Sequence, residues 1–144
     1  MPKITRFAAS LAIAASLLTG ARAAPPGHTP SAVPPAPPVI TALMSQALAD
    51  IPGKEGLMLL VDYPPGAADP IHRHDASAFV YVLEGNIVMQ VEGGREVTLA
   101  PGQTFYEGPS DIHLVGRNAS RTQPARFLAV LVKTQGAPAL TPIK

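Results

Sequence analysis

Cysteine and tryptophan are absent from this chain of 144 residues, in which aromatic side chains make up only 5% and charged side chains only 15%. Without cysteine, the chain has no disulfide bond and no thiol nucleophile. It also lacks a Gly-x-Ser-x-Gly sequence and a glycine-rich phosphate loop, which argues against a serine hydrolase and against phosphate binding of that kind. Stability must therefore come from an apolar core, alone or together with a bound metal.

The N-terminal residues have the three-part layout of a secretory signal peptide. Lys3 and Arg6 form a basic start, residues 7–19 are apolar or small, and Ala21-Arg22-Ala23 is an A-x-A cleavage site. The apolar run is shorter than the roughly 20 residues that a membrane-spanning helix needs. We expect residues 1–23 to be a signal peptide and the mature chain to be periplasmic or secreted. The alanine- and proline-rich leader looks bacterial.

Cleavage also changes the charge of the chain. Loss of three of the 11 basic residues, namely Lys3, Arg6 and Arg22, leaves 8 against 10 acidic residues, a net charge of about −2. A nucleic-acid partner is not expected, because proteins that bind nucleic acids carry clustered basic surface. No later run is apolar enough, over enough residues, to span a membrane, so we expect no membrane span after cleavage.

Proline dominates the stretch that follows the leader. Residues 24–38 contain seven prolines, which exclude a helix or a central strand. We interpret this stretch as an extended linker; the alternative is a polyproline ligand for a partner protein. His28 lies in this stretch and is expected to be solvated.

Short apolar segments separated by glycine and proline turns make up the rest of the chain, and predict a single all-β domain over residues 39–134. Residues 39–46 are ambiguous between strand and short helix, and the tail at 135–144 is expected to lie on the surface. The predicted strands are 57–63, a strand that holds His72 and His74, 78–83, 87–91, 96–99, 104–107, 113–116 and 126–133.

Three of the four histidines, His72, His74 and His113, have the spacing of a metal site. In His-x-His on a strand, both imidazoles point to one face because strand side chains alternate. A third histidine about forty residues later can complete a three-nitrogen face around one divalent ion. Iron, manganese, zinc, nickel and copper all accept imidazole, and the sequence does not choose among them.

The segments around these histidines resemble the two motifs of small, single-barrel cupins. In the first motif, Gly66 precedes His72-x-His74 by five residues, and Gly85 closes the motif. In the second, Gly102, Pro109 and His113 follow in order, although the proline and Asn118 each fall one place late and Ser110 stands where glycine is usual. The resemblance covers residues 57–133 and implies a cupin-type jelly-roll β-barrel that binds a metal and forms a homodimer.

One departure from the cupin pattern concerns the metal ligands. Cupins usually add a glutamate to the three histidines, and its position is occupied here by Ala78. Some cupin relatives use three histidines without the carboxylate. Glu107, six residues before His113, is the candidate for a replacement fourth ligand or for a general base; otherwise it lies at the rim or surface.

Other polar residues near the motifs have less specific signals. Asp75 follows His74 directly, so strand alternation directs it away from the site. Arg117, Arg121 and Arg126 are candidates to bind a substrate carboxylate, or they are solvated or lie at an oligomer interface.

Two functions remain compatible with these patterns. One is a metal-dependent enzyme that acts on a small organic anion, with dioxygenase, decarboxylase and isomerase chemistry all open. The other is a non-catalytic module that binds or senses a small ligand or a metal. Polar side chains in the cavity besides the histidines would favour the enzyme, whereas a barrel filled by apolar side chains up to the metal would favour binding.

Overall fold

The protein is described here by a computed structural model, which places residues 34–143. This part of the chain is all β-structure, without a helix, as the sequence predicted. No helix in it is long and apolar enough to cross a membrane. The predicted signal peptide and most of the proline-rich linker, including His28, lie outside the described residues.

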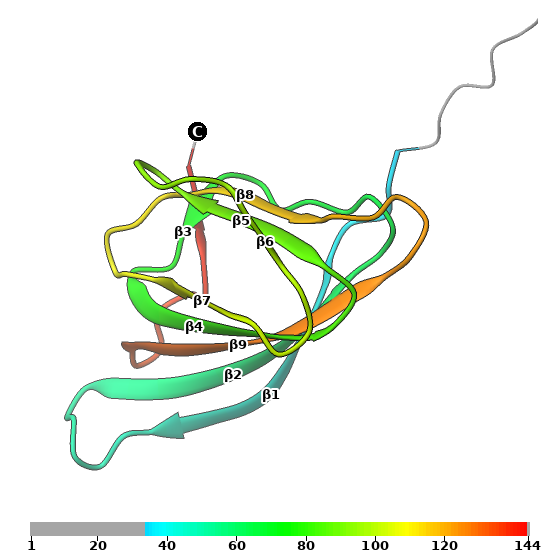
Figure 1. Ribbon diagram of the computed structural model, residues 1–144. Coiled ribbons are helices and arrows are strands. Elements are labelled where there is room, and N and C mark those ends of the chain that lie inside the picture. Colours follow the sequence, from blue (N-terminus) through cyan, green and yellow to red (C-terminus); the bar gives the residue numbers. More distant parts are fainter. Residues whose placement is uncertain (1–33, 144) are drawn as a thin grey trace, which may run out of the picture. The chain divides into compact units, whose positions relative to one another are not determined.

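Two antiparallel five-stranded sheets face each other and form the jelly roll (Figure 1). The first sheet has the order β1 (Val39–Ala47), β2 (Lys54–Tyr63), β9 (Ala125–Thr134), β4 (Ala76–Glu84) and β7 (Thr104–Glu107). The second has the order β10 (Thr141–Pro142), β3 (His72–Arg73), β8 (His113–Asn118), β5 (Ile87–Val91) and β6 (Val97–Leu99).

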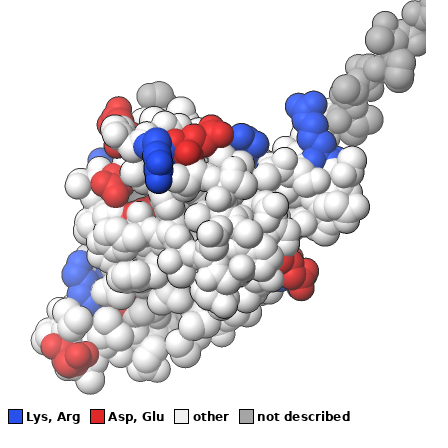
Figure 2. All heavy atoms as spheres, viewed as in Figure 1, with Lys and Arg blue, Asp and Glu red and all other residues white. Residues whose placement is uncertain are grey.

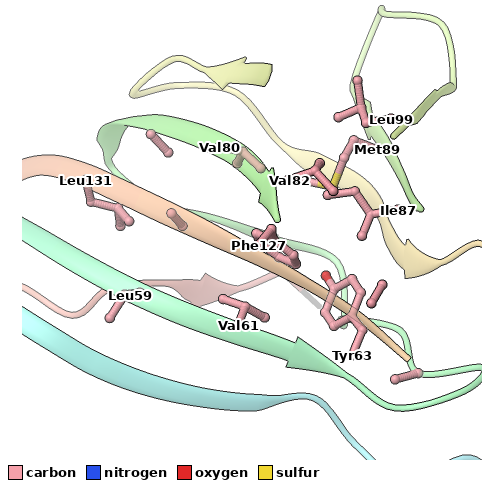
Figure 3. Close-up of a cluster of buried hydrophobic side chains, with 14 of the residues drawn as sticks. Leu59, Val61, Tyr63, Val80, Val82, Ile87, Met89, Leu99, Phe127 and Leu131 are labelled. Atoms are coloured by element: carbon pink, nitrogen blue, oxygen red, sulfur yellow. The ribbon is translucent and has the colours of Figure 1, made fainter. Parts of the chain in front are cut away.

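The core fills the space between the sheets. On β9, buried residues alternate with half-buried ones, so that Phe127 and Leu131 point inward while Leu128 and Val130 point outward. The ring of Tyr63 packs edge-on against Phe127, with centroids 5.0 Å apart. Figure 3 shows these side chains of the first sheet meeting Ile87, Met89 and Leu99 from the second. The apolar run of β9 is therefore covered on its inner face only.

Three segments differ from the sequence-based expectation. The ambiguous residues 39–46 belong to strand β1, which pairs with β2. The strand expected to hold both histidines ends at Arg73, so His74 lies just beyond it, next to Asp75 with its positive φ of 50°. The tail is not merely surface: β10 pairs with β3, because Thr141 and Pro142 lie opposite Arg73 and His72. In Figure 1 the C-terminal segment (red) runs from β9 across to β3.

Candidate metal centre

The structure brings together His72, His74, Glu107 and His113. They come from β3, the residue after it, the end of β7 and the start of β8. His72 and His113 are paired directly across the β3–β8 ladder, which places their side chains on the same face.

One atom of each residue contributes to a closed ring. The Nε2 atom of His72 is 3.2 Å from Nε2 of His74 and 3.4 Å from Nδ1 of His113. Oε2 of Glu107 is 3.5 Å from Nε2 of His74 and 3.3 Å from Nδ1 of His113. Two ligand atoms about 2.1 Å from one ion, at 90–110° to each other, are about 3.0–3.4 Å apart. Three of the four distances lie in this range and the fourth, 3.5 Å, is close to it, as expected of residues that can hold a single divalent ion.

Hydrogen bonds on the far sides of two rings fix which nitrogens face the centre. Nδ1 of His72 lies 2.8 Å from the Pro70 carbonyl oxygen, and Nδ1 of His74 lies 2.8 Å from that of Ala139. A carbonyl accepts a hydrogen bond only from a protonated nitrogen, so a neutral ring keeps its lone pair on Nε2. Two lone pairs thus face each other at 3.2 Å, an arrangement that a cation between them stabilises.

Burial disfavours the charged form of two of the imidazoles, those of His74 and His113. Desolvation lowers the pKa of His113 to about 4 and also lowers the pKa of His74. Desolvation raises the pKa of Glu107 to about 7, with Asp69 and Asp111 adding to the effect. Oε2 of Glu107, the carboxylate atom of the ring, is buried without a hydrogen-bond partner in the described part of the chain. Neutral nitrogens and an unpartnered carboxylate are the groups that a metal ion needs.

Glu107 lies beside the position where the family's glutamate is missing. Ala78 on β4 and Glu107 on β7 are register partners, so their side chains share one face of the first sheet. Both are buried and both line the central cavity. The carboxylate absent at position 78 is thus present on the neighbouring strand.

A cavity of about 90 Å³ adjoins the four ligands. Ten of its fifteen lining residues are apolar, among them Leu59, Val80, Met89 and Phe127. Among the described residues, Asp69 is the one polar lining residue outside the cluster. The cavity is therefore neither filled by apolar side chains nor rich in polar ones.

Sequence patterns did not single out Asp69. Its carboxylate accepts a hydrogen bond from the hydroxyl of Tyr63, which is fully buried. Burial raises the pKa of both groups. Asp69 stands three residues before His72 in a proline-containing loop, and the only signal in the sequence was its position within the first motif.

The C-terminal tail is the second contribution that sequence analysis missed. Besides the Ala139 carbonyl that holds His74, the side chains of Ala139 and Leu140 line the cavity. A strand of two residues has no periodicity that a sequence pattern can detect.

The remaining candidates lie away from the cavity. Asp75 is exposed and forms an ion pair with Arg73. Arg117 pairs with Glu96, and Arg126 pairs with Asp62. None of the three candidate arginines is among the lining residues of the described chain, so none binds a ligand carboxylate there.

Comparisons with known proteins agree with this architecture. Residues 59–131 match the family model described as a cupin domain. The cupin-domain-containing oxidoreductase fogC of Aspergillus ruber (strain CBS 135680) is 29% identical over 73 residues, which are 51% of this chain and 36% of that protein.

Solved structures show the same fold. The DMSP lyase DddQ from Ruegeria pomeroyi DSS-3 has a TM-score of 0.52 at 24% identity, over 60% of this chain and 42% of that one. An oxalate oxidase in complex with the substrate analogue glycolate has a TM-score of 0.56 at 21% identity, over 74% of this chain and 55% of that one. The chain spans about a third to just over half of the length of these three proteins.

Proposed function

The chain belongs to the cupin family, and on that premise we propose that it is a metal-dependent enzyme acting on a small organic anion. The observation that carries this proposal is the ring of four ligand atoms at the wall of a cavity. Four protein ligands would leave free positions on an ion that accepts five or six ligands, and the four residues that would hold it line the cavity.

A divalent ion at this centre would supply a Lewis acid that binds anions and lowers the pKa of coordinated water. The protein's own residues do the rest. The carbonyls of Pro70 and Ala139 orient two imidazoles, and Glu107, when ionised, would offset one positive charge of the ion. The apolar walls exclude water, which strengthens the attraction between the centre and an anion.

The three compared proteins support the proposal because the names of all three describe enzymes. Their names describe an oxidoreductase, a lyase and an oxidase, and the last is in complex with a small carboxylate. The type of reaction catalysed by this chain stays open among dioxygenase, decarboxylase and isomerase chemistry.

A second candidate function is a module that binds or senses a small ligand without reaction. The apolar lining favours it, because in the described part of the chain only Asp69 adds a polar side chain beyond the four ligands. Asp69 and Glu107 in turn favour the enzyme, because they place two carboxylates in one small cavity.

Metal analysis of the natural protein, purified without an affinity tag and both with and without oxygen, tests the proposal. We expect about one divalent ion per chain, in line with the single ligand cluster of the described residues. Protein that is correctly folded but contains no stoichiometric metal would contradict it.

Export is proposed on the leader sequence alone. N-terminal sequencing of protein from its natural host should show a mature chain that begins at Ala24. An intact Met1 in the cytoplasm would refute this location.

A further inference from the structure

The cavity beside the metal centre is too small for most metabolites. An engineered protein cavity of about 150 Å³ holds benzene, which has six non-hydrogen atoms. The volume here is about 90 Å³. By the same ratio, the cavity accepts a ligand of about three to five non-hydrogen atoms, apart from any that contact the ion.

The walls of the cavity have few side chains that could form a hydrogen bond with a second polar group of a ligand. Among the described residues that line the cavity there is no lysine, arginine, serine, threonine, asparagine or glutamine. The one polar side chain outside the ligand cluster, Asp69, is an acceptor whose carboxylate is already bonded to the Tyr63 hydroxyl. A second carboxylate on the far end of a ligand would be desolvated without a donor, and a hydroxyl there would find an acceptor only at Asp69, so both are unfavourable against a methyl group.

The charge of the centre selects the head group. Three neutral imidazoles and one ionised carboxylate leave a divalent ion with a net charge of about +1. A single negative charge on the ligand balances it. A second negative charge would lie in an apolar cavity near Asp69.

We infer that the cavity binds a short-chain monocarboxylate, with the carboxylate at the metal centre and an apolar chain of a few carbons against Leu59, Val80 and Phe127. This inference rests on the proposed metal centre and narrows its substrate class. Ala129 lies on the inner face of β9 and lines the cavity, so a larger side chain there would take up part of the space for the apolar chain.

The test uses the full mature chain loaded with cobalt(II), whose visible absorption reports a change in its ligands. Propanoate, butanoate, 3-hydroxypropanoate and benzoate are titrated at constant pH and ionic strength. Butanoate and 3-hydroxypropanoate have the same size and differ only in a terminal methyl or hydroxyl group. We expect propanoate and butanoate to change the spectrum, 3-hydroxypropanoate to bind at least about tenfold more weakly than butanoate, and benzoate to have no effect.

Two variants test whether the acids bind in the cavity. Ala129→Val should weaken the binding of butanoate more than that of propanoate. Val132 lies on the outer face of the same strand and outside the groove on that face, so Val132→Leu should change neither.

The outcomes separate the inference from its premise. Equal or tighter binding of 3-hydroxypropanoate, or binding of benzoate, would overturn the inference, as would a cobalt-loaded protein that responds to none of the acids. Failure of the folded protein to take up cobalt at all would overturn the proposed metal centre itself.

Discussion

Glu107 supplies a carboxylate to the candidate metal centre from β7, directly across the strand pair from Ala78. If Glu107 is a ligand, its loss should be repaired by a carboxylate at the position opposite. Glu107→Ala should weaken metal binding by about 100-fold or more, since even residues that only orient ligands contribute 10–100-fold. The double change Ala78→Glu with Glu107→Ala should recover most of that loss. Competition with a chelator measures both.

Ala78→Glu in the presence of Glu107 is the matched control, because it adds a carboxylate without removing one. A double variant that binds metal as weakly as Glu107→Ala would show that Glu107 acts otherwise, as a general base. In that case Glu107→Gln should keep the metal while any activity falls by roughly 100-fold or more.

The three histidines act as one unit with Glu107. Each of His72→Ala, His74→Ala and His113→Ala removes one corner of the ring of ligand atoms, and the remaining corners surround an ion incompletely. We expect each variant to lose stoichiometric metal, to fold, and to melt at a lower temperature than the metal-loaded protein. His28→Ala is the control. Loss of metal from His28→Ala as readily as from His113→Ala would contradict the site.

The buried carboxyl of Glu107 should also make the free energy of unfolding of the metal-free protein depend on pH. Its pKa is about 7 when folded and 4.5 ordinarily, so the unfolded chain loses the proton first and stability falls as the pH rises between these values. His113 acts oppositely, because its folded pKa of about 4 is below its ordinary 6.5 and stability rises over that range.

Glu107→Gln removes the pH dependence that is due to Glu107 and leaves the opposite dependence that is due to His113. The variant's free energy of unfolding minus that of the natural protein should therefore increase by about 3 kcal/mol between pH 4.5 and 7.5. Urea unfolding in the presence of EDTA at both pH values gives this difference. A difference that is constant with pH would contradict the raised pKa.

At the scale of elements, the C-terminal strand β10 connects the tail to the metal centre. The carbonyl of Ala139 accepts a hydrogen bond from His74. Two residues later in the chain, β10 pairs with β3, the strand that carries His72. A chain that ends at Ala137 should bind metal about 10–100-fold more weakly, because His74 loses the group that orients it. Thr141→Ala, which removes only a hydrogen bond to Asp75, is the control. Equal metal affinity of the shortened and full chains would contradict this role.

The elements also differ in how far the sequence predicts them. Strands such as β5 and β7 were predicted with their observed bounds, because glycine and proline turns enclose short apolar or aromatic segments. Strand β10 was not predicted, because its two residues form a strand only by pairing with β3. The spacing of the histidines indicated which side chains meet. It did not reveal the Ala139 carbonyl, which is 65 residues from His74, or Asp69, which lies in an irregular loop where no periodic pattern indicates the direction of a side chain.

At the scale of the whole molecule, apolar side chains cover much of the outer face of the first sheet. Phe79, Tyr81 and Tyr106 are each about half exposed there, beside the half-buried Leu128 and Val130. An open groove runs between them. On the face of the molecule shown in Figure 2, charged side chains lie mostly around the margin and the middle carries few. Exposed apolar patches of this kind mark protein interfaces more often than free surface.

We propose that a second copy of the chain covers this face in a homodimer. Light scattering of the mature protein at micromolar concentration should give twice the mass of one chain. Phe79→Glu should convert the dimer to a monomer, because it places a charge in the middle of the apolar face. Ile51 is also nearly half exposed but lies in the turn after β1, so Ile51→Glu is the control and should leave the dimer intact. A natural protein that is monomeric at this concentration, or dissociation by both changes alike, would contradict the proposed interface.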